Sequence, residues 1–250
     1  GRYSCKWYTE PTGGELLGGG GEAYTPPADS NSANAAYARC EIINYTISYN
    51  LNGGSATNPT SYTIESNSIT LSNPTRTGYT FNGWTGSNGS TASTSVTIAS
   101  GSTGDKSYTA NRTPITYTID YNLNGGSATN PTSYTIESNI TLNNPTKTGY
   151  RFTGWTGSNG STANTSVTIH GSTGNKSYTA NWSANEYTVT FDKQGGSGGV
   201  SSLTVTYGWQ VVYFGYDKVP TKKGYVFGGY YTGTNGSGTQ YYNSSLSPTR

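Results

Sequence analysis

Charged side chains are scarce in this sequence of 250 residues, where they make up 10% of the chain and leave a net charge of only +2. The few Lys and Arg residues are spread along the chain and form no cluster, which argues against nucleic-acid binding. No apolar run approaches a membrane span, so we expect no membrane insertion within this segment. The sequence has no Met, hence no initiator residue, and we expect a segment excised from a longer chain.

Histidine is almost absent as well, because His170 is the only one. A Ser-His-Asp site or a His-rich metal site would have to be built on this residue alone. The nearly identical earlier copy of its surroundings has Ala99 and Ser100 instead, so we interpret His170 as a loop residue. The stretch Asp29 to Asn34 hints at a calcium loop but lacks the Gly and the distal Glu that such a loop needs. The sequence therefore predicts no enzyme, no cofactor and no metal site.

Aromatic residues are abundant instead, with 23 Tyr and 5 Trp. Low hydrophobicity alone would suggest disorder, but disordered chains are usually rich in charge and poor in aromatics. Aromatic rings bury a large area per residue, so they can form a core. A chain rich in Tyr, Thr and Gly, without a convincing amphipathic helix, favours strands. We therefore predict a mainly β chain with little or no helix.

Internal repeats organise this β chain. Residues 45–67 and 117–139 differ only at Ser48 and Asp120, and a divergent third copy follows them. The third copy has no counterpart of the closing strand, and the start of the chain resembles the second half of a repeat. We predict four parts: 1–44 as the C-terminal half of a repeat, 45–112 and 113–182 as complete repeats, and 183–250 as a divergent repeat lacking its last strand.

Each repeat is centred on the motif Gly-Tyr-x-Phe-x-Gly-Trp, found at residues 78–84 and 149–155 and, loosened, at 224–230. Its Tyr and Phe alternate with polar residues, which predicts a strand with one apolar face. The Gly-Trp step breaks this alternation, as a β-bulge would. We predict that the cores of the repeats contain Tyr79, Phe81, Trp84, Tyr150, Phe152, Trp155, Tyr225, Phe227 and Tyr230.

The order of motifs resembles a known family. The pattern Tyr-Thr-Ile-x-Tyr-Asn-Leu-Asn-Gly-Gly, then the central motif, then a closing Tyr-Thr-Ala-Asn-Trp is similar to the Listeria–Bacteroides repeat, the internalin B-repeat family of bacterial surface proteins. The resemblance is strong over residues 45–182, good over 187–250 and weak over 1–40. It implies small β-grasp-type modules, in tandem on secreted and cell-surface proteins, that serve as stalks and spacers and sometimes in adhesion. It brings no catalytic residues, and it implies an extracellular or cell-surface location.

Cys5 and Cys40 are the two cysteines. In the weak alignment of the first 44 residues, they fall on the motif strand and the closing strand of the half-repeat. If those strands pair, a disulfide would staple a half-repeat that has too little core of its own. The alternative is two free thiols, and a mass shift on reduction distinguishes the two cases.

The leading functional hypothesis is structural. Repeats of about 70 residues in a row would make a stiff stalk or fibre, and strand addition between copies of the chain could join the incomplete ends head to tail. A proteolytic boundary would explain the same ends. The alternative is an adhesin that binds a glycan or host surface protein weakly and multivalently through the polar loops Thr85–Ser90 and Thr156–Ser161. Adjacent tyrosines cannot both face one side of a sheet, so we expect a contact surface at Tyr231, Tyr241 and Tyr242.

Overall fold

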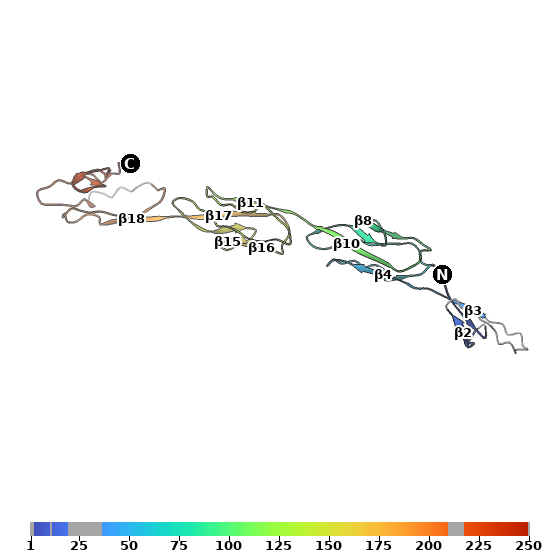
Figure 1. Ribbon diagram of the computed structural model, residues 1–250. Coiled ribbons are helices and arrows are strands. Elements are labelled where there is room, and N and C mark those ends of the chain that lie inside the picture. Colours follow the sequence, from blue (N-terminus) through green and yellow to red (C-terminus); the bar gives the residue numbers. More distant parts are fainter. Residues whose placement is uncertain (1–2, 11, 20–36, 210–217, 250) are drawn as a thin grey trace, which may run out of the picture. The chain divides into compact units, whose positions relative to one another are not determined.

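The computed structural model describes residues 3–10, 12–19, 37–209 and 218–249, and the regular structure in Figure 1 consists almost entirely of strands joined by turns and loops. Two compact units divide the chain: residues 1–116 with 135–137, and residues 117–134 with 138–250. Across the described ranges, the helical element is the short 3-10 turn η2, Thr234–Gly236, and no helix is long and apolar enough to cross a membrane. The prediction of a mainly β chain of small mixed sheets in tandem is confirmed.

The first repeat contains a five-stranded mixed sheet with the strand order β5-β4-β10-β7-β8. Its central strand, β10, runs parallel to β4 on one side and antiparallel to β7 on the other. A separate antiparallel pair is formed by β6 and β9. The strands are β4 Tyr45–Asn50, β5 Ser61–Tyr62, β6 Ile69–Thr70, β7 Tyr79–Gly86, β8 Gly89–Ser93, β9 Thr97–Ile98 and β10 Lys106–Pro114.

The second repeat has the same topology, with a sheet of order β12-β11-β17-β14-β15 and a separate β13-β16 pair. Here β17 is the central strand, parallel to β11 and antiparallel to β14. The strands are β11 Tyr117–Asn122, β12 Ser133–Tyr134, β13 Asn139–Thr141, β14 Tyr150–Gly157, β15 Gly160–Asn164, β16 Thr168–His170 and β17 Lys176–Ala184.

The two ends of the chain contain parts of this arrangement. The N-terminal sheet, of order β2-β1-β3, is antiparallel and corresponds to β8-β7-β10. In the third repeat β18 pairs with β19 and β20 pairs with β21, and among residues 187–209 and 218–249 no strand takes the central place of β10. The strands are β1 Tyr3–Tyr8, β2 Leu16–Gly19, β3 Tyr37–Ile42, β18 Glu186–Thr190, β19 Ser202–Thr206, β20 Tyr230–Tyr231 and β21 Gln240–Tyr242.

Each of the first two repeats has its own aromatic core around a fully buried tryptophan. Trp84 of β7 has no exposed surface, and the rings of Phe81, Tyr49 and Tyr108 lie 5.5, 5.8 and 6.3 Å from it. The pairing of β7 with β10 shifts register just before Trp84, so the predicted bulge is present. The shift turns the Trp to the same face as the Phe, since strict alternation over three residues would place them on opposite faces. Trp155 has the equivalent position in the second core.

Not every predicted core residue belongs to a core. Trp84, Trp155 and Tyr230 are buried, and Phe81, Phe152 and Phe227 pack half-buried against the three clusters. The assignment of Tyr225 to a core is wrong, because 70% of its surface is exposed. Tyr79 and Tyr150 are half-buried and lie outside the clusters. Tyr79 and Tyr150 are the first residues of β7 and β14, and Tyr225 precedes β20. At these positions each ring packs against a cationic side chain and not against the core.

The polar stretch after the tryptophan is a tight hairpin and not the loop expected from sequence. β7 continues to Gly86 and β8 begins at Gly89, which leaves Ser87 and Asn88 as a two-residue turn. The flanking glycines have φ of +127° and +110°, which glycine adopts at little steric cost. The Asn88 Nδ2 atom donates a hydrogen bond to the carbonyl of Trp84 at 2.8 Å, so the turn is tied to the core residue.

High pH is expected to destabilise both complete repeats. Burial, with a smaller contribution from Tyr108 or Tyr178, raises the pKa of Tyr49 and of Tyr121 to about 12. The raised pKa means that the folded state holds the phenolic proton more tightly than the unfolded state does. The contribution of these two protonated tyrosines to the free energy of unfolding is therefore complete below pH 10 and is lost as the pH rises from 10 through 12. Urea unfolding at pH 9, 10 and 11 measures the loss, and the double variant Tyr49→Phe/Tyr121→Phe should lose less over this interval. An equal loss in both chains would contradict the assignment.

Candidate functional site

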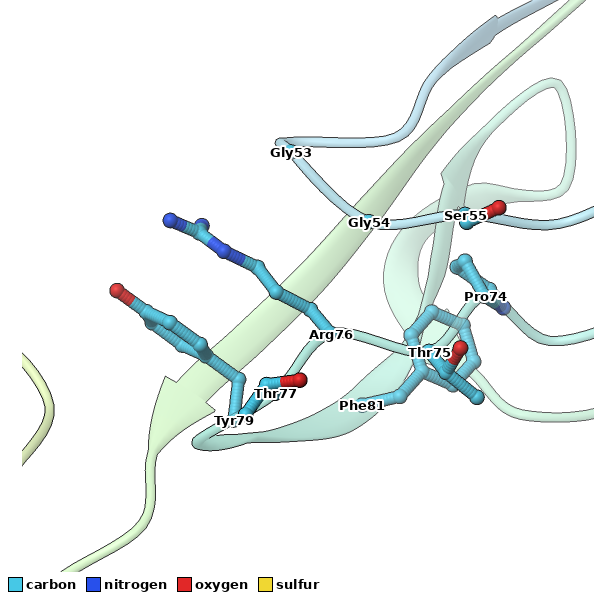
Figure 2. A pocket seen from close by; sticks show the side chains of 9 residues that line it. All are labelled: Gly53, Gly54, Ser55, Pro74, Thr75, Arg76, Thr77, Tyr79 and Phe81. Carbon is cyan, nitrogen blue, oxygen red and sulfur yellow. The ribbon is translucent and has the colours of Figure 1, made fainter. Parts of the chain in front are cut away.

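A shallow, open groove lies beside the glycine pair of the first repeat (Figure 2). The turn after β4 forms one wall, and the segment before β7, with the first residues of β7, forms the other. Figure 2 shows the side chain of Arg76 extending alongside the ring of Tyr79, and the guanidinium carbon lies 4.0 Å from the ring centre. The lining residues are Gly53, Gly54, Ser55, Pro74, Thr75, Arg76, Thr77, Tyr79 and Phe81.

The two adjacent glycines are each required for a different reason. Gly53 has a φ of +74° in the turn that follows β4, a conformation that favours glycine. Gly54 has an ordinary backbone, but a Cβ atom there would run into the guanidinium of Arg112, which extends from β10. The Nη2 atom of Arg112 donates a hydrogen bond to the carbonyl of Leu51 at 2.9 Å. The second glycine is therefore needed because a side chain of the central strand lies over it.

The second repeat carries the same groove with a different cover. Trp182 of β17 replaces Arg112, and its Nε1 atom donates to the carbonyl of Leu123 at 3.1 Å. A Cβ atom at Gly126 would run into the indole ring. The lining residues are Gly125, Gly126, Ser127, Pro145, Thr146, Lys147, Thr148, Tyr150, Phe152 and Trp182.

A cation stacks on the tyrosine of the motif in all three repeats. Arg76 covers Tyr79, the Nζ atom of Lys147 lies 4.3 Å from the ring centre of Tyr150, and Lys222 lies 4.7 Å from that of Tyr225. This contact was missed in the sequence, although the signal was present: each copy has Arg or Lys three residues before the Tyr. Cation–π pairs at exposed sites contribute roughly 0.5–1 kcal/mol, so they fix the ring more than they stabilise the fold.

The electrostatics of the first groove follow from its two arginines and one hydrogen bond. Burial, then the neighbouring charge of Arg76, lowers the pKa of Arg112. The hydroxyl of Tyr79 donates a hydrogen bond of 2.7 Å to the carboxylate of Glu137, and this bond raises the pKa of Tyr79. Glu137 belongs to the same compact unit as Tyr79, although it lies in the turn after β12. The groove can thus accept polar or aromatic groups.

The titratable residues singled out in the sequence lie apart from this groove. His170 is exposed and is the last residue of β16, where it pairs with Asn139. Its assignment to a loop is therefore wrong, because it still belongs to the strand. Among the residues that the structure places, no group of three or more His, Cys, Asp or Glu side chains could hold a metal ion. The stretch Asp29 to Asn34 lies outside the described residues.

The structure joins Cys5 and Cys40 by a disulfide. The two residues are direct partners in the β1–β3 ladder. Counted from the first residue of β1 and β7, and from the last residue of β3 and β10, they take the place that Phe81 and Arg112 occupy between β7 and β10. A covalent bond therefore stands where the complete repeats have a side-chain contact.

The predicted contact surface at the tyrosine pairs is only partly exposed. Tyr241 has 46% of its surface exposed and Tyr231 is half-buried. The assignment of Tyr242 to a contact surface is wrong, because it is 3% exposed and packs in the third core with Tyr230. The physical reason is the alternation of β21, which turns one member of the pair inward.

Comparison with known proteins identifies the family of these repeats. No solved structure matches the chain. A protein of Evansella cellulosilytica, named "Putative membrane protein", is 29% identical over 214 residues, which cover 82% of this chain and 31% of that protein. The chain thus spans about a third of the length of this relative. The family model of the Listeria-Bacteroides repeat domain matches residues 45–113, 117–181 and 187–250. The chain therefore belongs to the Listeria-Bacteroides repeat family, as three consecutive repeats.

Proposed function

We propose that this chain is a non-enzymatic structural segment of a secreted or surface-displayed bacterial protein, in which the repeats form a stalk or fibre. The observation that carries the proposal is the duplication of a complete core. Trp84 and Trp155 belong to two cores whose buried residues correspond one for one in two successive repeats. A chain selected for one unique site would not need a second copy of the same core. A chain selected for the number of modules would.

The surface chemistry supports a spacer. The hairpins that leave each sheet carry Ser, Asn, Gly and Thr, and charge is sparse over the whole chain. Such a surface stays solvated without attracting a charged partner. The family match and the name of the Evansella relative both agree with a location at the cell surface.

The dimensions of the chain test this function. We expect that inserting a second copy of residues 45–116 before Tyr117 increases the maximum dimension in small-angle X-ray scattering by one constant step per inserted repeat. A compact globule would grow only as about the 0.38 power of the residue number. Chains with one, two and three inserted copies give the scaling directly. Growth along the globular curve would refute the stalk.

Head-to-tail joining of copies is a further part of this proposal. In the N-terminal sheet, β3 is the outermost strand, and it corresponds to the central β10 of a complete repeat. In the third repeat, β18 corresponds to β4, the parallel neighbour of β10. An exposed edge of β3 can therefore pair with β18 of another copy. The disulfide between Cys5 and Cys40 means that β3 enters such a pairing together with β1.

Electron microscopy tests this head-to-tail joining. It should show filaments that disappear when residues 1–44 are deleted, and filaments that persist after the deletion refute the joining.

The repeated grooves favour an adhesin as the second candidate. Each combines a tyrosine, a stacked cation and exposed backbone around a glycine pair, which suits weak binding of a sugar or a peptide. Two such sites in one chain would give multivalent binding. A glycan array probed with the full chain tests it, with Arg76→Ala/Lys147→Ala as the variant that should lose the signal. Absence of any binding above background refutes a glycan ligand.

A further inference from the structure

The third repeat contacts the second repeat at Gly149 and Tyr150. The backbone N–H of Asn185 donates to the carbonyl of Gly149 at 2.9 Å, and the N–H of Tyr207 donates to the carbonyl of Asn185 at 2.8 Å. The ring of Tyr207, just after β19, meets the ring of Tyr150 edge to face, with the centres 5.6 Å apart. These residues all belong to the second compact unit. We call Gly149 and Tyr150, with Gly78 and Tyr79 and with Gly224 and Tyr225, the Gly-Tyr steps.

The glycine of this step makes room for the following repeat. Gly149 has a φ of +77°, which already favours glycine. In addition, a Cβ atom at this position would run into the ring of Tyr207. The ring of Tyr207 thus fills the space that a side chain at position 149 would take.

The first compact unit repeats this arrangement with different side chains. The N–H of Ile115 donates to the carbonyl of Gly78 at 2.9 Å. A Cβ atom at Gly78 would lie 2.7 Å from the Cδ1 atom of Ile136, and Tyr79 donates its hydroxyl to Glu137. The turn at Thr135–Glu137 follows β12, as the turn at Tyr207 follows β19. Two Gly-Tyr steps are therefore covered by the same turn of the next repeat, through an aliphatic side chain in one case and a ring in the other.

The third Gly-Tyr step has the same local shape but is exposed. Gly224 has a φ of +80°, and no atom of the residues that the structure describes lies within 4 Å of a Cβ placed there. Tyr225 is 70% exposed and the adjacent Val226 is 96% exposed, although Lys222 stacks on Tyr225 as its counterparts do on Tyr79 and Tyr150. The ring and the open glycine are thus already arranged as in the two covered steps.

We propose that the Gly-Tyr step is a docking surface for the turn of the following repeat, and that Gly224 and Tyr225 present such a surface to one further repeat of the same family. The occupant needs a bulky side chain, Ile or Tyr, to fill the space above the glycine. It also needs an acceptor or a ring to meet the tyrosine. This inference goes beyond the stalk, since an adhesin built of the same repeats would use the same docking.

A matched pair of glycine variants tests the docking in the full chain. Gly149→Ala and Gly224→Ala introduce the same methyl group at nearly the same positive φ, so the cost to the backbone is common to both. Tyr207 is already 40% exposed. We expect Gly149→Ala to displace its ring and to raise its rate of hydroxyl-radical modification toward that of a fully exposed tyrosine, while Gly224→Ala leaves that rate unchanged. If Gly149→Ala prevents folding, Tyr207→Ala should raise the modification rate of Tyr150 in a folded chain. Unchanged rates in both variants overturn the proposal.

A longer chain tests the open surface of the third repeat. A second copy of residues 171–250 joined after Arg250 supplies a central strand for the third repeat and then a further repeat with its own Tyr207 turn. We expect the modification rate of Tyr225 to fall several-fold relative to the original chain. The control is the same extension with Tyr207→Ala in the added copy, which keeps the strand but removes the docking ring, and Tyr225 should then regain much of its reactivity. Equal protection by both extensions, or protection by neither, overturns the assignment of this surface.

Discussion

Replacing Trp155 by Ala is expected to destabilise the second repeat by about 3–5 kcal/mol, the cost typical of truncating a large buried aromatic side chain. The indole has no exposed surface, and it contacts the rings of Tyr121, Phe152 and Tyr178 at 5.4–6.4 Å. Its removal leaves a cavity at the centre of the sheet and strips three rings of their common partner. Since each repeat has its own core, we expect the loss to be local. Residue-resolved hydrogen exchange should show the amides of β14 and β17 opening first, with those of β7 and β10 nearly unaffected.

Trp182 provides the matched control, because the first repeat has Arg112 in its place. Trp182→Arg should therefore cost little, since an arginine can donate to the carbonyl of Leu123 as Arg112 donates to that of Leu51. A large loss at Trp182 together with a small one at Trp155 would show that the core is centred elsewhere. Equal loosening of both repeats by Trp155→Ala would show that they unfold as one unit.

The second large effect is expected from the disulfide. Its cysteines are 35 residues apart, and closing a loop of this size removes enough unfolded-state entropy to stabilise the folded state by about 3–4 kcal/mol. The double variant Cys5→Ser/Cys40→Ser should open the β1–β3 sheet, which contributes no buried residue to the three cores described. Amide exchange should become fast in β1 and β3 while the protection of β4 to β17 is retained.

The pair that the complete repeats use at this position gives the control. Cys5→Phe/Cys40→Arg installs the residues of the Phe81–Arg112 pair, whose ring and guanidinium lie 6.0 Å apart. A non-covalent contact of this kind contributes roughly 0.5–2 kcal/mol, so protection should return only in part. Full protection of β1 and β3 in the double Ser variant would mean that the disulfide is dispensable for the half-repeat.

Much of the repeat was predictable because the sequence contains it twice. The alternation of Tyr and Phe with polar residues in the central motif predicted the strands β7 and β14, and the broken alternation at the Gly-Trp step predicted the bulge. These features depend on side-chain periodicity within one strand, which neighbouring elements reinforce. Aligning a half-repeat with whole ones suggested a bond between Cys5 and Cys40 but left two free thiols as the alternative, and the strand pairing decides for the bond.

The remaining features depend on contacts between segments distant in sequence. Tyr79 and Tyr225 have the same local pattern, yet one is half-buried and the other exposed, because the turn that covers the first comes from the next repeat. No local pattern around Tyr79 indicates its contact with Glu137, which lies 58 residues later. The role of Gly54 was hidden for the same reason, since the side chain above it comes from Arg112. Local patterns predict strands and faces, whereas the partner of an exposed ring depends on the topology.

The placement of β4 beside β10 determines how a repeat would respond to a pulling force. These two strands are where the chain enters and leaves the repeat, and they run parallel as neighbours, with Ile47 opposite Lys106 and Asn50 opposite Thr109. Tension on the chain pulls the start of β4 and the end of β10 in opposite directions along their common axis. The hydrogen bonds between them are then loaded together in shear, instead of being opened one after another from an end. β11 and β17 meet in the same way, so each complete repeat would resist extension at the centre of its sheet.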